Sequence, residues 1–171
     1  MWIQNVSLED IKKGHHIDAG PNSVLIQILD PDMEFPEPFH KFGSVHQFQF
    51  LDIEEDGIVH TGAGKTIDLS ELAITDDQAK SLSLILTQAF LNRSNVVVHC
   101  HAGVCRSGAV VEVGIKMGFN DTEAFRSPNL LVKHKMMDFL GFEYDKNEPH
   151  TINGVELDSG LIVPKNYKGD I

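Results

Sequence analysis

Two short apolar segments constrain the fold of this chain more than any other feature of its sequence. Residues 23–29 (SVLIQIL) are mostly β-branched or aliphatic and predict a buried strand, which Asp30-Pro31 closes. Residues 95–99 (NVVVH) are of the kind that is buried on both faces of a parallel sheet. Helical patterns alternate with these strands. This order predicts an α/β fold with a central, mainly parallel β-sheet flanked by α-helices.

Three segments have the residue spacing of helices that bury one face. The first follows a capping box in which Thr75 is the N-cap and Gln78 bonds back to it, and Gly141 closes the last one. The three segments are 76–91, 107–118 and 128–140. Residues 120–123 (NDTE) resemble a second capping box, which predicts a further helix start there.

The remaining segments give weaker patterns. Aromatic and polar residues alternate before Leu51, so residues 45–53 are expected to form a strand that ends or bulges near Leu51. Prolines make residues 30–41 a loop, and acidic residues with glycines favour a loop over 52–65. Residues 156–163 are compatible with a last strand.

Length and charge limit the functions open to the chain. With 171 residues it has the size of one domain and can bury a hydrophobic core without metal or disulfides. The formal net charge is −11 at pH 7. Such an acidic chain is a poor candidate for nucleic acids or anionic membranes, which both require a positive surface. One locally positive anion pocket is still allowed.

Cysteine content and the N-terminus indicate the compartment. Two cysteines do not make a disulfide framework. The N-terminus lacks a basic segment followed by an apolar stretch, so we expect no secretory signal. Apolar runs are far shorter than the ~20 residues that a membrane helix needs. We therefore expect a cytoplasmic protein without a membrane span.

The segment 99–108 (HCHAGVCRSG) carries the chemistry. It joins the predicted strand 95–99 to the following helix, at the carboxyl end of a buried strand, where open α/β sheets bind ligands. Its backbone N–H groups and the helix N-terminus form an anion site. Both the helix dipole and Arg106 would favour the thiolate of Cys100, and Arg106 can bind a phosphate with two parallel hydrogen bonds. A thiolate at the floor of a phosphate site implies phosphoryl transfer through a cysteinyl-phosphate.

These residues resemble a known signature. The sequence His99-Cys100, five residues, Arg106-Ser107 is similar to the HCxxGxxR[S/T] motif of the protein tyrosine phosphatase superfamily, and Ala102-Gly103 is closest to its small, dual-specificity-like branch. Further similarity to that branch extends over about 24–142, in the segments 48–54, 76–91 and 127–129. The resemblance implies a cysteine-dependent phosphatase domain over 1–150 and leaves 151–171 as an extension of unknown role.

The resemblance assigns a role to each loop residue. Cys100 would be the nucleophile, and Ser107 would donate a hydrogen bond to its thiolate. His99 would hold the loop and favour that thiolate. Arg106 would bind the phosphate together with backbone N–H groups. The phosphate-binding residues would be His101, Ala102, Gly103, Val104, Cys105 and Arg106.

The family also requires a general acid on a loop after an earlier strand, to protonate the leaving oxygen. Asp52 is the first carboxylate beyond the predicted strand, and the sequence Phe50-Leu51-Asp52-Ile53 resembles an F-x-D-I pattern of small bacterial and phage-type members. Asp52 is our first choice. Asp56 and Asp68 are the alternatives.

Two loop residues depart from the usual pattern. His101 stands where dual-specificity members often have Lys or Arg, so less positive charge is available there. Cys105 precedes Arg106 as in low-molecular-weight phosphatases. This similarity implies a reversible, redox-sensitive disulfide with Cys100, and a packing role for Cys105 is the alternative. Although His99, Cys100, His101 and Cys105 are all potential zinc ligands, adjacent ligands rarely converge on one ion. We expect no metal and no cofactor.

The expected function is hydrolysis of a phosphate monoester, with a phosphorylated protein as partner. Phosphotyrosine is the first choice of substrate, and dual specificity that includes phosphoserine and phosphothreonine is open. One alternative is a catalytically weak module that only binds phosphoproteins. Another is a phosphatase for a non-protein phosphate, although such substrates usually need several basic residues near the loop and only Arg106 is firmly cationic there. The sequence does not predict an oligomeric state.

Overall fold

A five-stranded sheet forms the centre of the computed structural model, which describes residues 1–54, 57–60, 64–153 and 155–156. The strand order is β3-β2-β6-β1-β7, and all four pairings are parallel. This confirms the expected α/β class with a parallel sheet. The strands are β1 (Trp2–Val6), β2 (Val24–Leu29), β3 (Ser44–Gln49), β6 (Val96–His99) and β7 (Asn120–Asp121).

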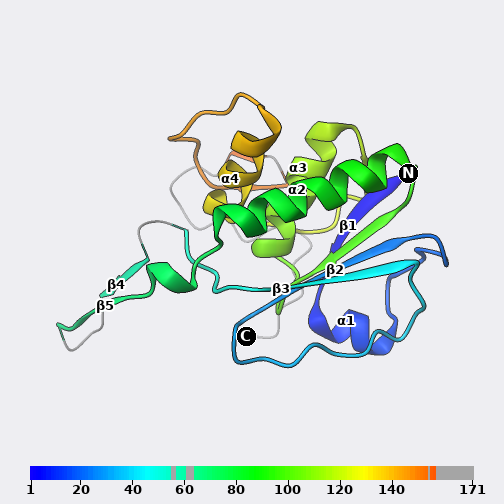
Figure 1. Ribbon diagram of the computed structural model, residues 1–171, viewed down its shortest axis with the longest axis horizontal. Coiled ribbons are helices and arrows are strands. Elements are labelled where there is room, and N and C mark those ends of the chain that lie inside the picture. Colours follow the sequence, from blue (N-terminus) through cyan, green and yellow to red (C-terminus); the bar gives the residue numbers. More distant parts are fainter. Residues whose placement is uncertain (55–56, 61–63, 154, 157–171) are drawn as a thin grey trace.

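Helices cover both faces of this sheet. Figure 1 shows three of them on one face and the short helix α1 on the other. The helices are α1 (Leu8–Lys13), α2 (Asp76–Leu91), α3 (Arg106–Met117) and α4 (Leu130–Leu140), with a 3₁₀ turn η1 at Ser70–Leu72. Within the described ranges, no helix is long and apolar enough to cross a bilayer.

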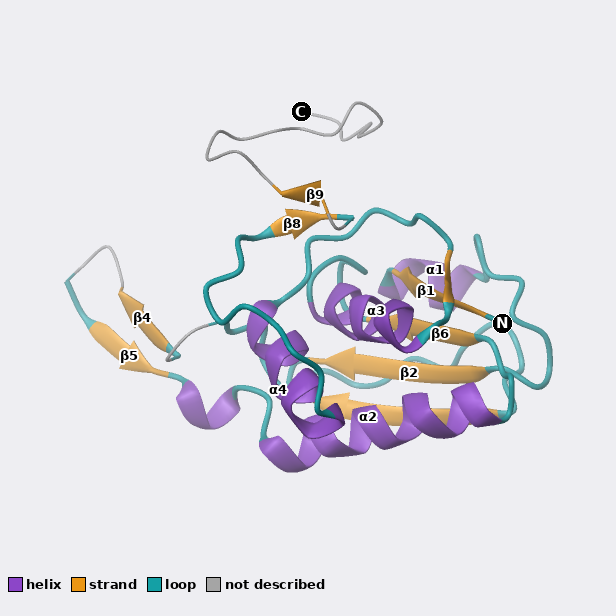
Figure 2. Cartoon of the chain, turned by 90° about the horizontal axis from the view of Figure 1, so that it is seen from above, coloured by secondary structure: helices purple, strands orange, loops and turns teal. Residues whose placement is uncertain are grey.

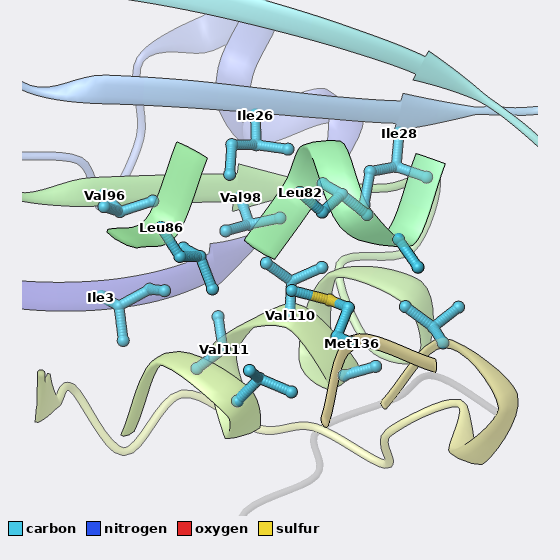
Figure 3. Close-up of a cluster of buried hydrophobic side chains, with 14 of the residues drawn as sticks. Ile3, Ile26, Ile28, Leu82, Leu86, Val96, Val98, Val110, Val111 and Met136 are labelled. Carbon is cyan, nitrogen blue, oxygen red and sulfur yellow. The ribbon is translucent and has the colours of Figure 1, made fainter. Parts of the chain in front are cut away.

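The main core lies between the sheet and the three-helix layer (Figure 3). Alternate residues of β2 and β6 point into this layer, and the residues between them, Leu25 and Val97, pack in a second cluster towards α1. Burying one such aliphatic side chain contributes about 1.5–3 kcal/mol. Both faces of the central strands are therefore apolar. The side chains in the main core include Ile3, Ile26, Ile28, Leu82, Leu86, Val96, Val98, Val110, Val111 and Met136.

The predicted strands 23–29 and 95–99 are confirmed as β2 and β6, and the three predicted helices as α2, α3 and α4. The capping box of α2 is present as expected, with both the Thr75 and Gln78 hydrogen bonds. Gly141 ends α4 with a φ of 70°. The strand predicted over 45–53 ends earlier, at Gln49.

Two expectations need correction. The helix start at 120–123 is wrong: Asn120 and Asp121 form β7, and the Asp121 side chain accepts from the Glu123 N–H, which makes a turn rather than a cap. The segment 52–65 is not all loop, because β4 (Ile58–His60) pairs antiparallel with β5 (Thr66–Asp68). Figure 2 shows this hairpin projecting from the body.

Both chain ends also differ from the expectation. Two elements, β1 and α1, lie before residue 23, in a segment for which the sequence pattern names no element. Polar Gln4 and Asn5 interrupt the apolar pattern of β1, which hides the strand. Near the other end, β8 (Thr151–Ile152) pairs with β9 (Val155–Glu156). The remainder of the strand predicted over 156–163 lies outside the described residues.

Candidate active site

The loop 100–105 lies between the end of β6 and the start of α3. Because all strands of the sheet are parallel, the ends of β2 and β3 lie at the same edge as the end of β6. Residues that follow these strands therefore face the loop from the side. The amino end of α3 adds a partial positive charge that favours an anion at this position.

The loop is seated on the corner between β1 and α1. The Leu8 N–H donates to the His101 carbonyl oxygen at 3.1 Å. Gly103 has a φ of 74°, in the left-handed region, and a Cβ added to it would lie 2.4 Å from the Val6 carbonyl carbon. Only glycine combines this conformation with so close an approach of two backbone segments.

Cys100 lies at the floor of the loop with 2% of its surface exposed. Its Sγ is 3.2 Å from the Ser107 Oγ, within hydrogen-bond distance for a sulfur atom. His99 is fully buried, and burial lowers the pKa of its imidazole to about 4. At neutral pH the ring is uncharged and lends no positive charge to the neighbouring thiol. Its Nδ1 lies 3.3 Å from the Cys100 carbonyl oxygen, so the ring contacts the backbone at the start of the loop.

Arg106 is buried although it is charged, with 4% exposure. Its Nη1 donates to the Asp30 Oδ1 and to the Phe50 carbonyl oxygen, each at 2.6 Å. Its Nε is buried without a hydrogen-bond partner among the described residues, and the Asp52 Oδ2 is 3.9 Å away. A buried donor without an acceptor is costly, and an oxyanion held by the loop would satisfy it.

Asp52 is brought to the loop by Asn129. The fully buried Asn129 donates from Nδ2 to the Asp52 Oδ1 at 2.7 Å and to the Ile53 carbonyl at 3.1 Å. Its backbone N–H donates to the Cys105 carbonyl at 3.1 Å. One residue thus joins the segment that carries Asp52 to the phosphate loop. Asp52 itself is about one third exposed, so its carboxyl can reach a bound molecule.

The other two acid candidates are placed differently. Asp68 lies on the exposed β5, where its carboxylate accepts from the Ser70 N–H at 2.9 Å. Hydrogen bonds from the Ser70 side chain and from this N–H lower the pKa of Asp68. No contact between Asp68 and the loop residues is seen in the part of the chain that the structure describes. Asp56 lies outside the described residues.

Cys105 is half-buried beside the candidate acid. Burial, together with negative charge at Asp52 and at Cys100, raises the pKa of its thiol to about 12. It is therefore a neutral thiol at physiological pH. His101 and Ala102 are exposed at the mouth of the loop.

Potential metal ligands do not converge here. Over the described ranges, no three His, Cys, Asp or Glu side chains are grouped so that they could hold a metal ion. This holds for His99, Cys100, His101 and Cys105 of the loop as well. The donors that converge on the loop suit an oxyanion instead.

Asp30 and Asn129 contact residues of the candidate site, Arg106 and Asp52, and the sequence pattern does not single them out. Asp30 follows β2 directly, as Asp52 follows β3 after two residues. The rule that carboxyl ends of parallel strands share one edge could have found it. Asn129 lies in the segment 127–129 that resembles the dual-specificity-like branch, but the sequence gives no sign of its contact with Asp52, which lies far from it.

Comparisons with known proteins add little to this geometry. No family model matches the sequence, and no curated protein is similar to it. Among solved structures, the chain is similar to OH1 from the Orf virus, described as a tyrosine phosphatase with distinct structural features and triple substrate specificity. The identity is 13%, the TM-score is 0.40, and the match covers 82% of this chain and 69% of that one. At that TM-score, the case for a function depends on the loop itself.

Proposed function

We propose that this protein is a phosphatase that hydrolyses phosphate monoesters through a cysteinyl-phosphate on Cys100. The observation that carries the proposal is the buried Arg106, whose Nε has no acceptor in the described part of the chain and lies beside a loop of backbone N–H groups. A phosphate oxygen would supply that acceptor, next to a cysteine that already contacts a hydroxyl. These are the parts that a thiolate nucleophile and its phosphoryl group require.

In the first step, the Cys100 thiolate attacks phosphorus in line with the ester oxygen. The bond between phosphorus and that oxygen breaks as the bond from sulfur forms. Asp52, in its protonated form, gives its proton to the leaving oxygen. Arg106 and the loop N–H groups stabilise the charge on the equatorial oxygens.

In the second step, water attacks the phosphorus of the cysteinyl-phosphate. Asp52 is now a carboxylate and takes a proton from this water. The bond from sulfur to phosphorus breaks, and Cys100 leaves as a thiolate that accepts a hydrogen bond from Ser107. Inorganic phosphate is released, and the protonated Asp52 is regenerated.

We infer that the substrate is phosphotyrosine in a protein. The burial of Cys100, with 2% exposure, supports this choice because a long aryl ester reaches a deep nucleophile more easily than a serine ester does. The net charge of −11 and the single firm cation of the loop, Arg106, disfavour substrates with several phosphates. Dual specificity remains an outcome of the substrate test below.

A redox function of Cys105 belongs to the same proposal. Its place in the same loop, five residues after Cys100, supports a reversible disulfide between the two residues. The two thiols would lose two protons and two electrons to a peroxide, which is reduced to water, and a cellular thiol would reverse the reaction. A cytoplasmic location, where thiols stay reduced, suits this chemistry.

The test is hydrolysis of para-nitrophenyl phosphate under reducing conditions with EDTA, with Cys100→Ser beside the wild type. We expect activity that survives EDTA and is lost in Cys100→Ser, while that variant still binds vanadate. Turnover by the variant would contradict the covalent mechanism. Absence of turnover in the reduced wild type, with phosphate still bound, would indicate a phosphoprotein-binding module. Phosphotyrosine, phosphoserine and phosphothreonine peptides then separate single from dual specificity.

A further inference from the structure

The Asn5 side chain lies directly behind the phosphate loop, on the strand that the sequence pattern does not predict. It is 4% exposed. Its Nδ2 donates to the Gly103 carbonyl oxygen at 2.7 Å and to the Phe125 carbonyl oxygen at 2.8 Å. One amide group therefore joins β1 to the loop and to the segment that leads to Asn129.

These contacts fix the direction of the loop carbonyls. In a trans peptide unit, the C=O and the following N–H point in opposite directions. Asn5 holds the Gly103 carbonyl towards β1, so the Val104 N–H is directed away from β1. The Leu8 N–H holds the His101 carbonyl in the same way, which directs the Ala102 N–H away from that corner. Backbone N–H groups with this orientation are the donors that a phosphate needs.

The arrangement has a cost. The Oδ1 of Asn5 is buried without a hydrogen-bond partner among the described residues. A buried acceptor without a donor destabilises a protein. The side chain thus donates to two carbonyl oxygens of other segments, while its own oxygen accepts no hydrogen bond from the described residues. Such a costly arrangement is typical of a residue that serves a functional site rather than the stability of the fold.

We propose that Asn5 is a positioning residue for phosphoryl transfer, which orients the 101–104 backbone towards the transferring phosphoryl group. The inference rests on the proposed phosphatase function. Asn5 does not touch the substrate, and it acts through the Gly103 carbonyl. Its removal should weaken binding of vanadate, which mimics the transition state, more than binding of phosphate.

The first test compares Asn5→Leu with Gln4→Ala. Leucine is close to asparagine in size and lacks both donors. Gln4 is a matched control, because its amide lies on the same strand but donates to the His16 carbonyl, away from the loop. We expect Asn5→Leu to lose roughly 10- to 100-fold in kcat/KM, equally on phenyl phosphate and para-nitrophenyl phosphate, with a larger loss of vanadate than of phosphate affinity. Gln4→Ala should retain wild-type values.

The second test uses Asn5→Asp, whose effect depends on pH. A neutral carboxylic acid can donate its O–H to the Gly103 carbonyl, but a carboxylate repels it. The activity of Asn5→Asp relative to wild type should therefore fall as pH rises through ionisation of the new carboxyl. The relative activity of Asn5→Leu should not change with pH. Circular dichroism at each pH confirms that the variants compared are folded.

Measurements on the unmodified protein do not depend on whether variants fold. Phosphate should shift the backbone amide NMR signals of Ala102 and Val104. Unchanged signals in a phosphate-bound protein would overturn the inference, as would a folded Asn5→Leu with wild-type vanadate affinity and turnover. If the wild type has no turnover, or if its turnover survives in Cys100→Ser, the proposed function itself fails, and the inference fails with it.

Discussion

Substitution of Gly103 by alanine tests whether the loop is seated on the β1–α1 corner. The φ of 74° costs a residue with a Cβ about 1–2 kcal/mol. The new Cβ would also lie 2.4 Å from the Val6 carbonyl carbon and 2.5 Å from the Ser7 nitrogen. Carbon atoms pack best at about 3.5–4.0 Å, so one backbone segment must move by about 1 Å.

Gly20 supplies a matched control. Its φ is 75°, and a Cβ added there meets nothing within 4 Å. Gly20→Ala therefore isolates the conformational cost, whereas Gly103→Ala adds an overpacking cost of about 1–3 kcal/mol. The lower entropy of the unfolded chain affects both variants alike and cancels in the comparison.

Urea unfolding measures the free-energy difference between the two variants, and para-nitrophenyl phosphate hydrolysis measures the site. We expect Gly103→Ala to be less stable than Gly20→Ala by about 1–3 kcal/mol. It should also lose roughly 100-fold in turnover, because a displacement of about 1 Å misplaces the phosphate donors. Gly20→Ala should keep full activity. Equal stability and equal activity of the two variants would refute the contact between Gly103 and the corner.

Three further substitutions test separate parts of the structure. Asp52→Asn should lower turnover by ~10²–10⁴-fold on phenyl phosphate and less on para-nitrophenyl phosphate, whose leaving group needs less protonation; equal losses on both esters would argue against an acid role. Burial lowers the His99 pKa from 6.5 to about 4, so between these pH values the unfolded state takes up a proton that the folded state does not. Unfolding free energy should therefore fall by up to ~3 kcal/mol as pH drops through this window, and His99→Gln should remove that dependence in urea titrations. Arg126 is 2% exposed and bonds Glu112 and Asp121, each at 2.6 Å; Arg126→Met should lose roughly 3 kcal/mol in unfolding free energy, and an unchanged urea midpoint would contradict this.

Local patterns account for the parts of the fold that the sequence predicts correctly. The strands β2 and β6 are apolar on both faces, and Thr75 and Gln78 cap α2 through residues close in sequence. The connection between β6 and α3, with Cys100, Gly103 and Arg106, is equally local. Such features depend on neighbours in the chain, so spacing and residue type are sufficient to predict them.

The parts that the sequence does not predict depend on distant partners. Asn5 contacts Gly103 across 98 residues, and Asn129 contacts Asp52 across 77. Asp30 meets Arg106 only because β2 and β6 are adjacent in the sheet. Polar residues in these positions look like ordinary surface or turn residues until the sheet order is known. At Asn120–Glu123 the local pattern predicts a helix start where the chain forms a turn. A hydrogen bond from the backbone to a side chain occurs in turns as well as in helix caps, so the pattern does not separate the two.

The sheet order has a consequence for how the protein is made. Strand β1 is synthesised first, but its only sheet neighbours among the described strands are β6 and β7, which follow some ninety residues later. During synthesis on the ribosome, β1 remains without a partner strand, whereas β2 and β3 can already pair with each other. The corner that supports Gly103 is therefore completed late in folding, since pairings so far apart in sequence form slowly. Detachment of β1 alone would remove the contacts that orient the loop backbone, while Cys100 and Arg106 remain chemically intact.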